Sequence, residues 1–230
     1  MRLVVRTLSQ QLVEVVRERI LSGEVAPEQS IRQDALAAEL GVSKIPLREA
    51  LGKLEQDGLL QSHPNRGFFV RPLSAEEAEE IYALRLRLEP EATGLAARRA
   101  APDEQRVAND MLDALERTTH AHAPGVGAAN RAFHLALLRP SQQEVTAGIL
   151  ERLHVLSERY VRKHLEPLGR DERANSEHRA LLSAWLGRDE AAVERLTRSH
   201  IERTLEDLRA QLRDDKGESE PCAHDRFSAR

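Results

Sequence analysis

The side chains best able to do chemistry in this sequence are three histidines and one asparagine in its second half. Asn130 and His134 are four residues apart, so on a helix they share one face, one turn apart. His178 lies nine residues before Gly187 and His200 eleven residues after Asp189, on either side of one tight turn. At a rise of about 1.5 Å per residue, two helices joined by that turn carry both imidazoles about 13–17 Å from it, at nearly one level. The spacing predicts that the four side chains converge.

Such a site would hold a divalent metal, because imidazole and amide oxygen are ligands for several of these ions. Zn²⁺ is expected first, with Ni²⁺ and Mn²⁺ as alternatives. The competing interpretation, a set of hydrogen-bonded core histidines, stays open from spacing alone. A lone cysteine, Cys222, excludes a disulfide framework and a cysteine-based zinc site. Of the other histidines, His154 and His164 are left between core edge and pocket, and the rest are expected in solvent.

The elements that position these residues are predicted to be helices, since no segment in this half alternates with the period of two that marks a strand. A capping box at Ser74–Glu77 opens the first helix, which runs to about Ala100, and a second box is expected at Ser141–Glu144. Five more helices are predicted, roughly at Asp103–Ala121, Gly127–Leu138, Gln142–Leu165, Arg173–Leu186 and Glu190–Leu212. We expect an all-α antiparallel helical bundle over residues 73–213 and a disordered polar tail over 214–230.

The first 72 residues have a different pattern. A helix is predicted over Leu8–Leu21, and a second one ends at Gly41, which suits a left-handed C-terminal cap. Ser43 then caps a third helix, whose leucines repeat at helical spacing and must face a core. This leaves Ser43, Lys44 and Arg48 on the outer end of that helix, where a recognition helix meets the major groove.

Two short strands, Leu59–Ser62 and Phe68–Arg71, are predicted after this helix, joined by a turn that contains Arg66 and Gly67. They would form the wing of a winged helix-turn-helix. An ordinary helical hairpin followed by a β-hairpin would show much the same pattern. The fold class expected for the whole chain is therefore mainly α, with an N-terminal winged helix-turn-helix and a C-terminal bundle.

The charge of the chain is unevenly divided. The formal net charge is −4, but residues 1–72 carry +1 and residues 73–230 carry −5. The basic residues of the N-terminal part are expected to form a modest patch for phosphates: Lys44, Arg48, Lys53, Arg66 and Arg71. A modest patch favours binding to double-stranded DNA as a dimer rather than as a single copy.

From Leu12 to Val70 the chain resembles the winged-helix domain of the GntR family of bacterial transcription regulators. The resemblance lies in several short segments: Ile20–Glu24, Pro27, Leu36-Ala37, Leu40–Ser43, Pro46–Leu51, Leu54, Gly58-Leu59 and Arg66-Gly67. Three positions depart from the family pattern, with Glu28 for glycine, Lys44 for arginine and Ile45 for threonine. Lysine cannot make the bidentate guanine contact of arginine, so the operator sequence is left open.

Ile81–Glu89 resembles the opening helix of the FCD effector domain, which follows the winged helix in the FadR-like subfamily, and the count of six helices resembles its VanR-like variant. The resemblance implies a metal bound by an Asp-x-x-x-His pair and two later histidines. Asn130 replaces the aspartate here, so metal binding is expected to be weaker or absent. Arg85 resembles a basic residue near the effector pocket of the family, where it would bind an anion. The alternative interpretation is that Arg85 forms an ion pair with Glu89 on the helix surface.

Together these features predict a cytoplasmic, homodimeric transcription regulator, a repressor rather than an activator, that a small organic acid releases from a palindromic operator. No apolar run approaches the roughly 18–20 residues of a membrane span, and no signal peptide is visible. Two alternatives are kept. One is a constitutive DNA-binding dimer with a metal-free, structural bundle; the other is a metal-dependent hydrolase or lyase, which lacks a well-placed general base.

Overall fold

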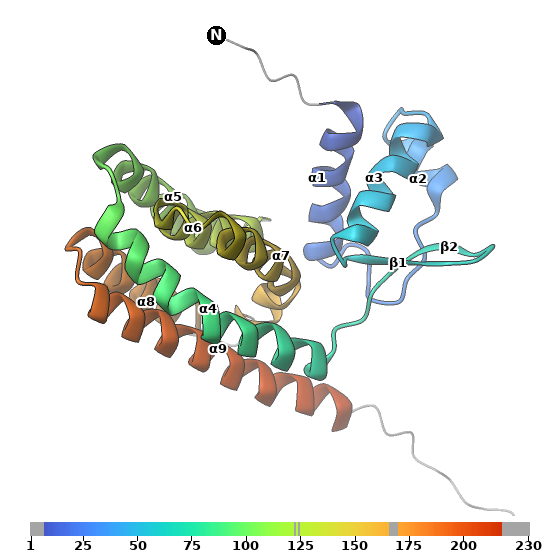
Figure 1. Ribbon diagram of the computed structural model, residues 1–230. Helices are drawn as coiled ribbons and strands as arrows, with labels where there is room; N and C mark the ends of the chain where they lie inside the picture. The colour runs from blue at the N-terminus through green and yellow to red at the C-terminus, as the bar shows by residue number, and fades with distance from the viewer. Residues whose placement is uncertain (1–6, 122, 124, 166–169, 218–230) are drawn as a thin grey trace, which may run out of the picture.

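The computed structural model describes residues 7–121, 123, 125–165 and 170–217 of the chain. Its N-terminal part is a winged helix (Figure 1), with α1 at Leu8–Leu21, α2 at Gln33–Glu39 and α3 at Lys44–Gln56. Strands β1 (Leu60–His63) and β2 (Gly67–Val70) pair antiparallel, with Leu60 opposite Val70. Each strand lies one residue from its predicted position, because Asn65 in the turn and Gly67 at the start of β2, both at positive φ, set the register.

Local sequence explains this unit well. Gly41 has φ +66° directly after α2, as a left-handed cap requires. Ser43 is the N-cap residue of α3, although its side chain donates or accepts no capping hydrogen bond. Leu47, Leu51 and Leu54 are fully buried in a core shared with α1. The opposite side of α3 is thereby left in solvent.

The C-terminal part is the expected bundle of α-helices. Its long members α4 (Ala75–Arg99) and α9 (Glu190–Gly217) run side by side in opposite directions (Figure 1). The others are α5 at Pro102–His120, α6 at Val126–Leu138, α7 at Glu144–Leu165 and α8 at Arg170–Leu186, with a short 3₁₀ helix, η1, at Arg139–Ser141. Within the described residues, no helix is long and apolar enough to cross a membrane.

Three local predictions were wrong. Ser141 belongs to η1, so α7 begins later, at Glu144, without the expected capping box. Helix α9 continues to Gly217, past the predicted start of a disordered tail at residue 214; the rest of that tail, residues 218–230, is outside the described residues. At the start of α4 only half of a capping box forms, because the Ser74 N–H donates to the Tyr160 hydroxyl instead of to Glu77.

Glu77 is instead part of the junction between the two halves of the chain. Its carboxylate accepts from Arg159 Nη1 at 2.9 Å and pairs with Arg71 at 2.9 Å. Arg159 also donates to the carbonyl oxygens of Gly58 and Arg71, at the end of the recognition helix and the end of the wing. Helix α7 therefore holds the winged helix through both of these segments.

A second group of buried charges crosses the same junction. Arg17 on α1 binds Asp57, the C-cap residue of α3, at 2.8 Å and lies 3.7 Å from Glu158 on α7. Glu158 also lies 3.0 Å from Arg131 on α6, and its side chain is fully buried. Gly127 lets α6 approach it, since a Cβ there would lie 2.8 Å from Glu158 Cγ. Charged side chains thus form a continuous series from α6 to the recognition helix.

Candidate metal centre and nucleic-acid interface

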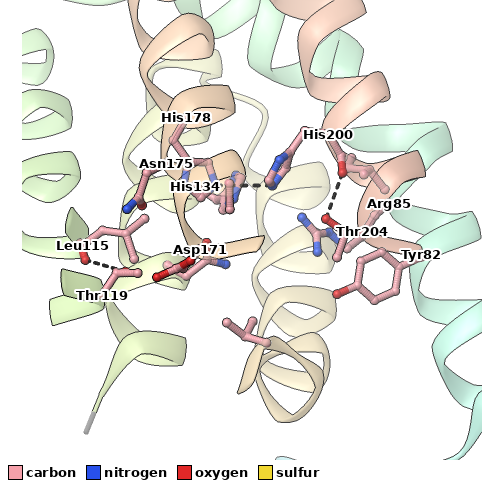
Figure 2. Close-up of a pocket in the computed structure, with 14 residues that line it drawn as sticks. Tyr82, Arg85, Leu115, Thr119, His134, Asp171, Asn175, His178, His200 and Thr204 are labelled. Carbon is pink, nitrogen blue, oxygen red and sulfur yellow. Dashed lines mark hydrogen bonds between the residues drawn. The ribbon is translucent and has the colours of Figure 1, made fainter. Parts of the chain in front are cut away.

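The three predicted histidines line one cavity in the helical bundle, where they face one another (Figure 2). His134 comes from α6, His178 from α8 and His200 from α9, and all three are buried. Each offers a ring nitrogen, and these atoms lie within 4.8 Å of one another. The Nε2 atoms of His178 and His200 are 3.3 Å apart. The two helices around Gly187 do place their imidazoles at one level.

A neighbouring carboxylate orients one of the imidazoles in the way that metal binding would require. Glu177 Oε2 lies 2.7 Å from His200 Nδ1, so Nδ1–H is the donor and the Nε2 lone pair faces His178. Burial opposes it, but hydrogen bonds from His200 and Arg203 lower the pKa of Glu177, which stays a carboxylate. A carboxylate behind a ligating histidine is the usual outer partner of a metal site. Glu177 therefore supports the site from outside and is not free to act as a base in it.

His134 carries the clearest sign of a missing partner. Its Nε2 is buried and has no hydrogen-bond partner in the described part of the chain. Its Nδ1 lies 3.7 Å from Glu89 Oε1, on the far side of the ring. Burial, reinforced by the nearby His178, holds the pKa of His134 well below its ordinary value, so the ring is neutral at pH 7. A neutral, buried imidazole whose ring nitrogen makes no hydrogen bond within the described residues suits a metal ion.

Asn130 lines the same cavity as His134, one turn away on α6, as their spacing predicted. Two further polar residues of the wall, Asp171 and Asn175, were not found from the sequence. They lie seven and three residues before His178 on α8, which places them on the same helix face as that histidine, and this spacing was the available signal. The cavity measures about 30 Å³, enough for an ion with a few solvent atoms.

Arg85 also lines the cavity, but its charge is already compensated. Its Nε donates to Glu89 Oε2 at 2.8 Å and its Nη2 to Glu89 Oε1 at 3.2 Å. The ion pair foreseen as the alternative for Arg85 therefore forms, and it is buried rather than on the surface, with side chains 5% and 1% exposed. Any anion that approaches Arg85 shares it with Glu89.

His154, which the sequence left between core edge and pocket, belongs to this group. Its Nε2 lies 3.2 Å from Glu89 Oε1, and its ring stacks on that of His134 at 5.3 Å between centroids. Against the effect of burial, Arg85 and His154 hold the pKa of Glu89 well below its usual value. Glu89 therefore joins the cavity wall of α4 to the histidines of α6 and α7. The side chain of His164 is outside the described residues.

The expected DNA-contacting residues lie together on the exposed end of α3. Ser43, Lys44 and Arg48 are all solvent-exposed, and the last two line a shallow hollow on the surface. Lys44 Nζ is held 2.6 Å from Asp34 on α2, whereas Arg48 has no ion pair within the described residues. Arg32 lines the same hollow; sequence analysis missed it, because it precedes α2 without a motif of its own.

Of the wing residues, Arg66 lies in the turn and Gly67 is the first residue of β2; the Arg66 guanidinium lies 5.2 Å from the centre of the Phe69 ring. Two members of the expected basic patch lie elsewhere. Lys53 pairs with Asp57 at 3.2 Å and Arg71 with Glu77 at 2.9 Å, both at the junction with the bundle. The patch on the DNA side is smaller than the sequence suggested, since Arg71 joins the two halves and Lys53 pairs with a carboxylate at the end of its own helix.

Both parts of the chain match known protein families. Residues 8–70 match the family described as "Bacterial regulatory proteins, gntR family", and residues 80–203 match the FCD domain. The chain belongs to the GntR family. Within this GntR-family protein the FCD match spans the cavity with its three histidines, and the gntR match spans the winged helix up to the end of β2.

Relatives along the full length are also regulators. The HTH-type transcriptional regulator YdhC of Bacillus subtilis is 28% identical over 211 residues, covering 90% of this chain and 93% of its own. The HTH-type transcriptional repressor RspR of Escherichia coli is 24% identical over 92% of each chain. The structure of E. coli McbR/YncC shares the fold, with a TM-score of 0.74 at 22% identity, over 90% of this chain and all of that one. This GntR protein is a DNA-binding transcription regulator, not an enzyme.

Proposed function

We propose that this protein is a dimeric repressor that binds a palindromic operator and leaves it when a small carboxylate binds at a metal site in the FCD domain. Residues 1–72 would bind DNA and the bundle from residue 73 would bind the effector and dimerise, in the cytoplasm. A repressor is favoured because the relative RspR carries that description. Ser43, Lys44 and Arg48 would enter the major groove, with Arg66 and Gly67 on the adjacent backbone.

The orphaned Nε2 of His134 is the observation that carries the metal site. It is buried, neutral and within 4.8 Å of ligand atoms of His178 and His200. These three would hold a divalent ion, most suitably Zn²⁺, with Ni²⁺ or Mn²⁺ as alternatives, and Asn130 would be a weak fourth ligand. When bound, the ion would supply open coordination positions and positive charge for an anion. Arg85 would stabilise the carboxylate from the α4 side of the cavity.

The buried charges of the junction offer a route from this site to DNA. Asn130 and His134 face the cavity, while Arg131, the residue directly after Asn130, contacts Glu158 at 3.0 Å. Glu158 lies 3.7 Å from Arg17, which binds the cap of the recognition helix at Asp57. A small movement of α6 on ligand binding would therefore change contacts that position α3. Release of the operator then requires that the effector bind the DNA-bound and DNA-free conformations of the protein with different affinity.

Metal content, melting temperature and operator binding test this proposal together. Protein purified without chelator should contain a divalent metal, and Zn²⁺ added after chelation should raise the melting temperature, since a ligand of the folded state alone stabilises it. Small carboxylates should then release the protein from its operator, and neutral sugars of equal size should not. Specific DNA binding without metal and without stabilisation by Zn²⁺ would instead favour the constitutive dimer with a structural bundle.

A further inference from the structure

The recognition helix carries a large apolar side chain on its exposed end. Ile45, in the first turn of α3, is 73% exposed to solvent. Single exposed apolar residues are common on protein surfaces and need no explanation by themselves. Ile45 differs by its place, because it lines the surface hollow together with Arg32, Lys44 and Arg48. It is therefore an apolar contact point inside the basic surface that faces DNA.

We propose that Ile45 reads the C5-methyl group of a thymine in each half of the operator. The first residues of a recognition helix are those that meet base edges in the major groove. Thymine alone among the four bases presents a methyl group there, and apolar side chains contact it directly. Ile45 has no polar atom beyond its backbone, so against another base it would cover donors or acceptors without pairing them. This position therefore selects thymine.

The surroundings of Ile45 favour a well-defined contact. Leu47, two residues on, is fully buried in the winged-helix core and fixes the first turn of α3. Isoleucine is branched at Cβ and stiff at χ1, so ordering it against a base costs little entropy. Lys44, beside it, is held by Asp34 at 2.6 Å. Arg48, one turn further along, has no ion pair among the described residues and remains available for a neighbouring base or phosphate.

This inference rests on the operator binding of the proposed function but not on its metal or effector. It is tested by deoxyuridine substitution, which removes only the methyl group of thymine. A half-site is first obtained by in vitro selection with the wild-type protein. Each thymine in a symmetric operator is then replaced in turn by deoxyuridine, and the Kd is measured by fluorescence anisotropy at one salt concentration.

One thymine per half-site should respond. From the transfer free energy of a single buried methyl or methylene group, Kd should rise about fourfold when one half-site is changed and about fifteenfold when both are. Ile45→Ala should bind the thymine and deoxyuridine operators alike. Ile149→Ala is the matched control, because Ile149 is also exposed, at 47%, but lies on α7 in the bundle; it should keep the wild-type response.

Two results would overturn the inference. One is a wild-type protein that binds its selected operator and tolerates deoxyuridine at every position. The other is an Ile45→Ala variant that still discriminates at the responsive thymine. Circular dichroism of the variant checks its fold, and an exposed side chain is a safe site to change. If selection enriches no sequence at all, operator binding itself fails, which is a separate outcome that refutes both claims.

Discussion

His134 is the residue on which the proposed metal site most depends. Its Nε2 is buried without a partner among the described residues, and its neighbours His178 and His200 supply two more nitrogens. We predict that His134→Ala lowers metal content and melting temperature together, because the folded state loses both a ligand and the stabilisation that bound metal provides. Elemental analysis and thermal denaturation measure the two effects. His63→Ala, on the exposed wing, is the control and should alter neither.

A loss of melting temperature with unchanged metal content would contradict this prediction, since His134 would then be a core residue only. That outcome has a physical basis as well, because removing a buried ring beside Phe133 and His154 leaves a cavity. The two measurements separate a ligand from a packing residue.

A substitution at Asn130 changes the charge of the same site. Asn130→Asp should tighten metal binding on the order of tenfold, the scale on which residues around a metal change its affinity. The substitution adds a negative charge within one helix turn of His134. Competition with a fluorescent zinc chelator measures the affinity. Asn109→Asp, an exposed change on α5, should leave it unchanged; equal affinities of wild type and Asn130→Asp would remove residue 130 from the site.

At the scale of elements, the junction of α1, α6 and α7 depends on Glu158. Burial raises the pKa of Glu158, with Arg131 and Arg17 opposing the shift. Glu158→Gln should destabilise the protein on the order of 3 kcal/mol, because it leaves the buried Arg17 and the half-buried Arg131 with less counter-charge. Urea denaturation measures the change in unfolding free energy. Glu151→Gln, an exposed substitution on the same helix, should have almost no effect.

An unchanged unfolding free energy for Glu158→Gln would contradict the prediction and show that the desolvation of Glu158 cancels its attraction to the arginines. The same variant bears on the route from the cavity to DNA. If that route passes through Glu158, the carboxylate-dependent release of the operator should weaken even where the metal is retained.

At the scale of the whole molecule, we expect operator binding to depend on dimerisation. The DNA side of the winged helix presents few free cations, since Lys44 is paired with Asp34, and Lys53 and Arg71 pair with carboxylates away from that side. One half-site contact should therefore be too weak alone, and we predict a dimer that binds an inverted repeat. Light scattering at micromolar concentration should give twice the mass of one chain. A monomer with and without operator DNA would refute this.

The sequence alone determined the elements and much of the cavity, because these depend on local rules. Helical periodicity and capping residues predicted α1 and the order of the six bundle helices, and Gly41 predicted the turn before the recognition helix. Similar spacing on either side of the turn at Gly187 was enough to bring His178 and His200 together. Such signals need only the fixed geometry of one helix or one hairpin.

Only the tertiary structure decided which charged side chains are paired within the chain and which remain exposed to solvent. Arg85 is compensated by a buried Glu89, which also contacts His154 from another helix, and Arg71 points to the bundle instead of DNA. Glu158 meets Arg17 across more than a hundred residues of sequence. A charged side chain has no periodic signature that names its partner, and its energy depends on burial and on distances of a few ångströms, which are properties of packed elements.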